Sequence, residues 1–178
     1  LPSVRLGSAG ETFTRQVQVA TGEGHAWAVR SDGELTQIDQ LTARKTASVD
    51  LGHTASGIGT GFDAVWVVDN LQGTLTQIDA NDLRAIEDFE TPGGADAIAV
   101  GAGAVWIIDS DAGVVSPFDT ALGSFDSPIR VGTDPTDIAV GLGWVWVTNH
   151  GDGTISQIDP ITRDVVETIT IGSSVAAL

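Results

Sequence analysis

The sequence predicts an all-β protein, a β-propeller built of four-stranded antiparallel blades of about forty residues each. Three observations predict this fold: a repeat of nearly constant length, several short apolar segments in every repeat, and no helical periodicity. The repeat is marked by tryptophans 39, 40 and 40 residues apart, and by glycines and aspartates 40 residues apart. These markers are Trp27, Trp66, Trp106 and Trp146; Gly33, Gly73, Gly113 and Gly153; and Asp39, Asp79, Asp119 and Asp159.

Each repeat contains the signals of a β-meander in the same order. A short segment rich in small residues precedes a Gly-x-Gly turn and the strand that carries the tryptophan. In the second repeat Asp63 replaces the second glycine of this turn. The tryptophan strands, such as Val105 to Ile108, are apolar on both faces, so the sheet must be covered on both sides. A turn at the marker glycine leads to a third strand that ends at the marker aspartate, which predicts a hairpin. A more variable fourth strand, clearest at Val165 to Ile171, closes the repeat.

Sheets that are apolar on both faces stack on copies of themselves, and radial stacking of four-stranded meanders gives a propeller. A two-sheet sandwich is the alternative. Full repeats cover about residues 17–56, 57–94, 95–134 and 135–174, and segments 1–7 and 175–178 match parts of further blades. A partial blade cannot bury its faces alone. We therefore expect residues 1–178 to form one propeller domain or a piece of a propeller of about six to eight blades, or the partial blades to be completed by self-association.

The composition excludes several classes of partner and chemistry. The chain has 24 acidic and 8 basic residues, a net charge of −16 and no cysteine. Nucleic acid is a poor partner, because few cations are available to displace the counterions of phosphates. Disulfides, thiol nucleophiles and thiolate metal sites are impossible without cysteine. No apolar run approaches the roughly 18 residues of a membrane span, so no membrane insertion is expected.

Polar side chains recur at the third position after each marker tryptophan. Equivalent positions of successive blades surround one axis, so these side chains could face a shared mouth. Asp69, Asp109 and Asn149 offer the oxygen ligands that Ca²⁺ prefers, which makes them a candidate metal and ligand site. The alternative is that they cap the turn that follows. Arg30 occupies the same position in the first repeat.

Two further residues of the fourth repeat are candidates for contact with a ligand or partner. Trp144 is an extra aromatic residue at a position that His25, Ala64 and Ala104 fill in the other repeats. Ordinary packing is the alternative interpretation. His150 follows Asn149 directly at the end of the same strand. The complete candidate contact set is Trp144, His150, Asp69, Asp109 and Asn149.

No catalytic residue is predicted. The three histidines do not share a metal-ligand spacing. Glu23 and His25 form a Glu-x-His pair, but the pair lies in the turn that other repeats fill with Gly-x-Gly. The marker aspartates recur once per repeat, so we expect each to serve its own blade by accepting backbone N–H bonds in the turn after its strand.

The repeats resemble a known family. The motifs are Ala-Val-Trp-Val, Trp-Val-Trp-Val-Thr-Asn, Gly-Thr-Ile-Ser-Gln-Ile-Asp-Pro, Val-Val-Glu-Thr-Ile-Thr-Ile-Gly and Asp-Pro-Thr-Asp-Ile-Ala-Val-Gly. Over residues 17–172 they resemble the bacterial YVTN-type and virginiamycin B lyase-like propeller repeats. Such blades occur in lyases, in sensor ectodomains and in large surface proteins. Lyases of this kind use a histidine and an acid with a divalent ion near the channel mouth, and no convergent set here matches.

The sequence therefore predicts a noncatalytic scaffold that binds a protein or a small ligand through its loop faces. The resemblance implies that it is part of a larger bacterial surface or secreted protein, outside the cytoplasm. The alternative is a virginiamycin B lyase-like enzyme whose catalytic residues lie on blades outside this chain.

Overall fold

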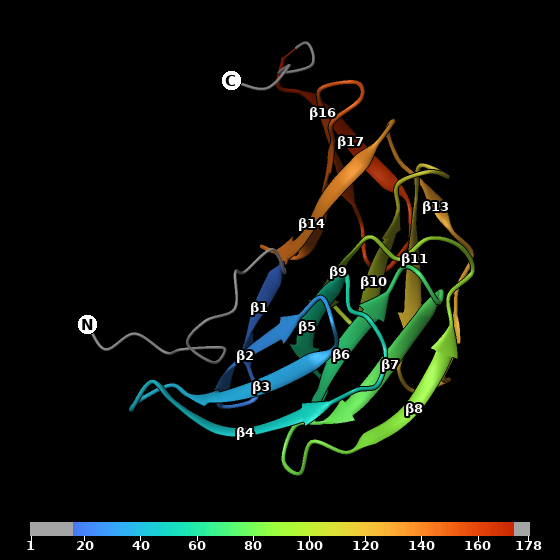
Figure 1. Ribbon diagram of the computed structural model, residues 1–178. Helices are drawn as coiled ribbons and strands as arrows, with labels where there is room; N and C mark the ends of the chain where they lie inside the picture. Colours follow the sequence, from blue (N-terminus) through green and yellow to red (C-terminus); the bar gives the residue numbers. More distant parts are fainter. Residues whose placement is uncertain (1–15, 173–178) are drawn as a thin grey trace.

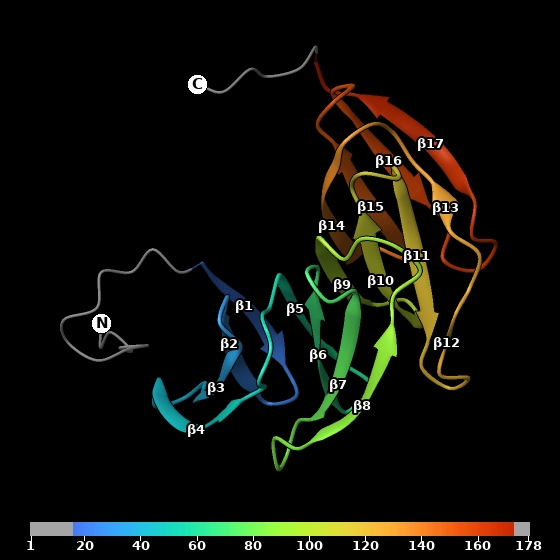
Figure 2. The same ribbon diagram turned by 45° about the vertical axis from the view of Figure 1, so that its right-hand side comes forward.

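The computed structural model of the chain describes residues 16–172, and all regular elements within them are β-strands. The propeller prediction is confirmed. Four separate sheets follow one another along the chain, and their strands pair antiparallel, in sequence order except at the outer edge of the third sheet. Figures 1 and 2 show these blades fanning out with their first strands side by side. A two-sheet sandwich is excluded, because each inner sheet packs on a different neighbour through each of its two faces.

The first two blades are regular four-stranded meanders. Their strands are five to seven residues long. In both blades the outermost pairing contains a β-bulge. Blade 1 comprises β1 (Val17–Gly22), β2 (His25–Arg30), β3 (Glu34–Asp39) and β4 (Arg44–Asp50), and blade 2 comprises β5 (Gly57–Gly61), β6 (Ala64–Asp69), β7 (Thr74–Asp79) and β8 (Ala85–Glu90).

The outer edge of the third blade differs from the others. Pro128 lies between the two short strands that form this edge, and proline has no N–H to continue a ladder. Both short strands pair with the same third strand, and the Asp126 N–H donates to Pro117 O at 2.8 Å. Blade 3 comprises β9 (Ala97–Gly101), β10 (Ala104–Asp109), β11 (Val114–Asp119), β12 (Ser124–Phe125) and β13 (Ile129–Arg130), and blade 4 comprises β14 (Pro135–Gly141), β15 (Trp144–Asn149), β16 (Thr154–Ile158) and β17 (Val165–Thr170).

Each marker tryptophan is fixed by one hydrogen bond inside its own blade. The indole Nε1–H donates to the carbonyl of the glycine that opens the Gly-x-Gly turn, five residues earlier. The distance is 3.0 Å from Trp66 to Gly61 and 3.2 Å from Trp146 to Gly141. A buried indole needs such an acceptor, so this bond explains why tryptophan and the glycine turn recur together.

The tryptophans form the core between blades. Trp27 packs against blade 2, Trp66 against blade 3 and Trp106 against blade 4, and all three are fully buried. Trp66 meets Phe118 of the next blade edge to face, with ring centroids 5.7 Å apart. The prediction that these residues form the inter-blade core is confirmed for these three, whereas Trp146 is only half-buried.

The marker aspartates cap their turns, as the sequence predicts. In every blade one carboxylate oxygen accepts the backbone N–H groups two and three residues further on. Asp79 Oδ1, for example, accepts from Asn81 N at 2.7 Å and from Asp82 N at 3.3 Å. The partial blades expected at residues 1–7 and 175–178 lie outside the described residues. Within residues 16–172 no helix is long and apolar enough to cross a membrane.

Candidate functional site

A cavity of about 260 Å³ lies where the first strands of all four blades face one another. Inner strands surround the axis of a propeller, so we call this space the axial cavity. Figure 1 shows β1, β5, β9 and β14 converging on this region. The cavity is lined by Gln18, Val19, Ser56, Gly57, Ile58, Asp96, Ala97, Ile98, Thr136 and Asp137.

Asp96 is held rigidly at the start of β9. Asn70 Nδ2 donates to its Oδ1 at 2.6 Å, and the Ser110 backbone N–H donates to its Oδ2 at 2.9 Å. The Ser110 hydroxyl donates to the same Oδ2 at 2.5 Å. These donors come from the ends of β6 and β10, so two blades fix one carboxylate at the cavity. The position of this carboxylate is therefore set before any ligand binds.

The lining of the axial cavity is polar and negative. Asp137 is exposed, and its Oδ1 accepts the N–H of Ile138 at 2.9 Å. Ser56 contributes a hydroxyl that donates to Ala95 O at 2.6 Å. The described lining contains two carboxylates and no lysine or arginine. The cavity therefore favours a cationic group.

Sequence reasoning missed these lining residues, although a signal for them exists. Ser56, Asp96 and Thr136 each lie ten residues before a marker tryptophan, so they occupy equivalent positions of three blades. The polar residues at the third position after each marker tryptophan are more conspicuous than these lining residues, because they are more often acidic. The side chain that faces the axis is set by the register of the first strand of each blade, and the spacing of the repeats does not reveal that register.

Asp69 and Asp109 connect each blade to the linker that enters it. Asp69 Oδ1 accepts from the Thr54 hydroxyl at 2.7 Å and from Leu71 N at 2.8 Å. Asp109 accepts from Gly94 N at 2.8 Å and from Ala112 N at 2.9 Å. Both side chains therefore cap turns, which is the alternative that the sequence offered to a metal or ligand site at these positions.

Asn149 binds its surroundings through both ends of its amide. Its Oδ1 accepts from Gly132 N at 3.1 Å, and its Nδ2 donates to Thr154 Oγ1 at 2.9 Å and to Ser156 Oγ at 3.0 Å. Among residues 16–172, no three His, Asp or Glu side chains are grouped so that they could hold a metal ion. Ca²⁺ binding at Asp69, Asp109 and Asn149 stays a prediction.

The other predicted contact residues of blade 4 lie on or near its outward face. Trp144 is half-buried and lies on the same face of β15 as Trp146. His150 lies in the turn after β15, where Nδ1 is 3.2 Å from Asp134 Oδ2 and both side chains are exposed. His150 and Asn149 also line a hollow of about 160 Å³ together with Thr136, Thr148, Gly153, Thr154, Ile171 and Gly172.

The remaining histidines have structural surroundings. His25 Nδ1 lies 3.0 Å from Glu23 O, and its ring packs edge-on against Trp27 with centroids 5.6 Å apart. His53 Nδ1 lies 2.8 Å from Thr54 O, and Asp69 Oδ2 is 3.6 Å from the same nitrogen. Neither histidine lines the axial cavity.

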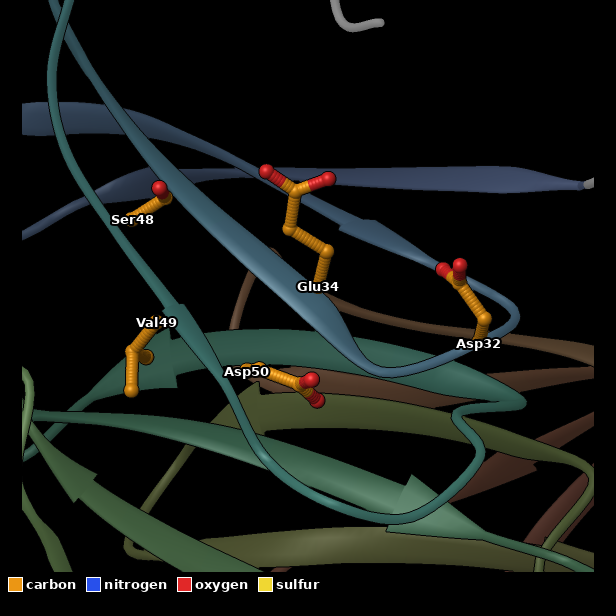
Figure 3. A pocket seen from close by; sticks show the side chains of 5 residues that line it. All are labelled: Asp32, Glu34, Ser48, Val49 and Asp50. Atoms are coloured by element: carbon orange, nitrogen blue, oxygen red, sulfur yellow. The ribbon is translucent and has the colours of Figure 1, made fainter. Parts of the chain in front are cut away.

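A second polar hollow, of about 250 Å³, lies on blade 1, as Figure 3 shows. Its acidic residues are largely neutralised by nearby cations. Arg30 Nη1 donates to Glu34 Oε2 at 2.6 Å, Arg30 Nη2 donates to Asp32 Oδ2 at 2.9 Å, and Lys45 Nζ lies 3.2 Å from Glu34 Oε1. Arg30, which occupies the third position after the first marker tryptophan, therefore forms ion pairs within its own blade. The hollow is lined by Asp32, Glu34, Ser48, Val49 and Asp50.

No protein-family model and no curated protein sequence matches this chain. Solved structures do resemble it. Hydrazine synthase of Kuenenia stuttgartiensis matches 93% of this chain with a TM-score of 0.76 and 12% identity, and glutaminyl cyclase of Myxococcus xanthus matches 85% with a TM-score of 0.65 and 15% identity. The WD40 repeats of RRP9 match 89% with a TM-score of 0.73 and 10% identity.

This chain spans 53%, 68% and 52% of the length of those three structures, in the same order. At such low identity the likeness concerns the fold alone. The chain shares the β-propeller fold with these proteins.

Proposed function

We propose that this propeller is a noncatalytic scaffold that binds a protein partner by taking a cationic side chain into the axial cavity. The observation that carries the proposal is the cavity itself, lined by Asp96 and Asp137 without a basic residue in the described lining. Its volume of about 260 Å³ lies just below the roughly 300–1,000 Å³ of pockets for drug-sized ligands. The space fits the end of one lysine or arginine side chain better than a larger free ligand.

A titration monitored by amide NMR tests this proposal. The probe is N-acetyl-lysine methylamide, and its control is the norleucine analogue, which has the same stem without the charge. We expect lysine-specific shifts at Ser56, Asp96, Thr136 and Asp137. Equal shifts with both probes, or shifts spread evenly over the acidic surface, would contradict the proposal.

A pair of charge-matched variants separates site binding from general attraction to an acidic chain. Asp137→Asn removes one exposed carboxylate from the cavity, whereas Asp82→Asn removes one from the turn between β7 and β8 of blade 2. Asp82 also makes a single local bond, accepting from Arg84 N at 3.0 Å, so the two changes are similar. We expect Asp137→Asn to weaken lysine binding by about fivefold, corresponding to roughly 1 kcal/mol, and Asp82→Asn to leave it unchanged.

We further propose that the chain belongs to the YVTN-type and virginiamycin B lyase-like repeats and acts outside the cytoplasm of a bacterium. The repeated sequence motifs support this family, and the propeller fold is consistent with it. Finding the full gene in a genome would test the location: an export signal ahead of these repeats is expected, and its absence would contradict the proposal.

A further inference from the structure

The hydrogen bonds of Asp96 leave only one of its oxygens open to a ligand at the axial cavity. A carboxylate has about four lone pairs, shared equally by its two oxygens. Both lone pairs of Oδ2 are used, because Oδ2 accepts from the Ser110 backbone N–H at 2.9 Å and from the Ser110 hydroxyl at 2.5 Å. Among residues 16–172, Oδ1 accepts one bond, from Asn70 Nδ2 at 2.6 Å. Asp96 therefore offers a ligand a single acceptor, on Oδ1.

The same bonds show from which side a ligand reaches Asp96. The bond from Asn70 is exposed, whereas the two bonds from Ser110 are partly buried. The accessible side of the carboxylate is therefore the side of Oδ1. Asn70 follows β6 of blade 2 and Ser110 follows β10 of blade 3, and both blades have a described neighbour on each side. The orientation of Asp96 thus does not depend on the outermost blades.

Ser56 also presents an acceptor to the cavity rather than a donor. Its hydroxyl hydrogen is committed to a backbone carbonyl, since Oγ lies 2.6 Å from Ala95 O and 3.1 Å from Val68 O. The same oxygen accepts from the backbone N–H of Asn70 at 3.2 Å. A hydroxyl has one hydrogen and two acceptor lone pairs. One lone pair of Ser56 therefore stays available for a ligand that donates.

Three blades thus bring hydrogen-bond acceptors to one cavity. Ser56 lies at the start of blade 2, Asp96 at the start of blade 3, and Asp137 in β14 of blade 4. Acceptors from several blades suit a group whose hydrogens point in several directions, as those of a primary ammonium do. The guanidinium of arginine is instead a planar fork that pairs best with both oxygens of one carboxylate. Asp96 cannot supply the second oxygen.

The rest of the lining favours an unmodified lysine. Trimethylated lysine has the same charge but no N–H donor, and proteins bind it in cages of aromatic side chains. The described residues that line the cavity include no aromatic residue. Val19, Ile58, Ala97 and Ile98 form the apolar part of the lining, which fits the methylene stem of a lysine.

We infer that the axial cavity is specific for the primary ammonium of a lysine side chain and discriminates against arginine and trimethyl-lysine. This inference rests on the proposed function, since it names which cation enters the same cavity. The ammonium donates to Asp96 Oδ1, and its other hydrogens are left for the acceptors of Ser56 and Asp137. Asn70 and Ser110 are positioning residues, because their bonds orient the carboxylate and leave it one oxygen for the ligand.

Amide NMR titrations of the wild type with three cations of equal charge test this specificity at pH 7. The probes are N-acetyl-lysine methylamide and the corresponding derivatives of arginine and Nε-trimethyl-lysine, and binding is read from the shifts of Ser56, Asp96 and Thr136. We expect lysine to bind about tenfold more tightly than either of the others. Equal affinities at these residues would overturn the inference and leave the proposed function intact. Shifts that do not depend on the charge of the probe would overturn both.

A fourth probe separates the two sources of a primary ammonium, a lysine side chain and the N-terminus of a chain. Alanine methylamide carries its ammonium beside the backbone and has no stem for the apolar lining. We compare it with N-acetyl-lysine methylamide at pH 6, where both probes are charged because an α-amino group has a pKa of about 7.7–8.0. Lysine should bind several-fold more tightly. Equal or tighter binding of alanine methylamide would overturn the assignment to lysine.

A variant of Ser110 tests the cause of the selectivity. Ser110→Ala removes the hydroxyl bond to Oδ2 and keeps the backbone bond, so each oxygen of Asp96 then has one free lone pair. Because a guanidinium can now pair with both oxygens, we expect the preference for lysine over arginine to fall about threefold. Ser110→Thr keeps a hydroxyl and should keep the preference.

Thr42→Ala is the matched control for this variant. It also removes a hydroxyl bond to a carboxylate, from Thr42 Oγ1 to Asp39 Oδ1 at 2.7 Å, but in a turn of blade 1 outside the cavity. Its ratio of lysine to arginine affinity should equal that of the wild type. An unchanged ratio in Ser110→Ala, or an equal fall in both variants, would overturn the assignment of the selectivity to Asp96. The wild-type titrations decide the specificity even if Ser110→Ala does not fold.

Discussion

At the residue scale, aspartate side chains recur in every blade, and their carboxylates accept hydrogen bonds from the turns and linkers beside the strands. The marker aspartates cap turns after the third strands, and Asp69 and Asp109 tie linkers to the blades they enter. In both patterns one carboxylate group accepts hydrogen bonds from several nearby donors. Acidity in this chain is therefore partly a consequence of turn chemistry, and this part was visible in the sequence spacing.

These hydrogen bonds predict how stability changes in acid. The Thr42 hydroxyl bond lowers the pKa of Asp39, and the Asn81 backbone bond lowers the pKa of Asp79. Because the folded pKa lies below the unfolded one, the stabilisation is complete above the unfolded pKa of about 3.9 and is lost as pH falls through the folded value. We expect the melting temperature to fall as the pH drops below about 4.

Asp79→Asn checks this assignment. Asparagine keeps an oxygen acceptor for the turn N–H groups but does not titrate, so the variant should lose less melting temperature than wild type between pH 7 and pH 3. Glu90→Gln, which changes an exposed carboxylate without a capping role, is the control. Equal acid sensitivity of the three proteins would show that the capped aspartates do not control the transition.

Turns and linkers set the geometry at the element scale. Gly33 has φ +90°, and a methyl group there would collide with the backbone carbonyl of His53 in the linker to blade 2. Gly24 also has a positive φ, +76°, but has nothing within 4 Å of the equivalent point among the described residues. Blade 1 therefore contains one glycine required by its backbone conformation alone, Gly24, and one required also by the close approach of the linker, Gly33.

Replacing each of these glycines by alanine should give different losses of stability. Gly24→Ala should cost about 1–2 kcal/mol through its left-handed conformation alone. Gly33→Ala should cost more, because the linker must also move away from the turn. Urea unfolding of both variants measures the difference. Equal losses would mean that the linker adapts freely and that the close approach does not contribute.

The tryptophan strands provide the second prediction at this scale. Trp66→Ala should lower the free energy of unfolding by about 3–5 kcal/mol, because it opens a cavity between two blades. Trp146→Ala should cost clearly less, because Trp146 is only half-buried and no further blade packs on it within residues 16–172. The measurement is urea unfolding of the wild type and both variants at one protein concentration. Equal costs would show that packing within the blade, rather than between blades, dominates.

The arrangement of blades is the main feature at the scale of the whole molecule. Four blades form an arc with their inner strands around one axis. The axial cavity depends on all four blades at once, since each contributes lining residues. A stable arc is therefore a condition for any binding at its axis.

Charge also acts at this scale. With a net charge of −16 the folded chain repels itself, and salt should screen this repulsion. We expect the urea midpoint to rise between 0.01 M and 0.15 M NaCl at pH 7. Near the sequence pI of about 4.1 the salt effect should nearly vanish, since the net charge approaches zero. A salt effect of equal size at both pH values would point to a cause other than net charge.

The sequence by itself determined the blade: its length, its strand order, its tryptophan core and its aspartate caps. These depend on local patterns, because strand alternation, turn glycines and cap spacing act within a few residues. Tertiary structure alone decided which side chains meet at the axis, why Asp96 rather than Asp69 lines the cavity, and why Trp146 is only half-buried whereas the other marker tryptophans are fully buried. These features require the positions of several blades relative to one another, and no single repeat contains that information.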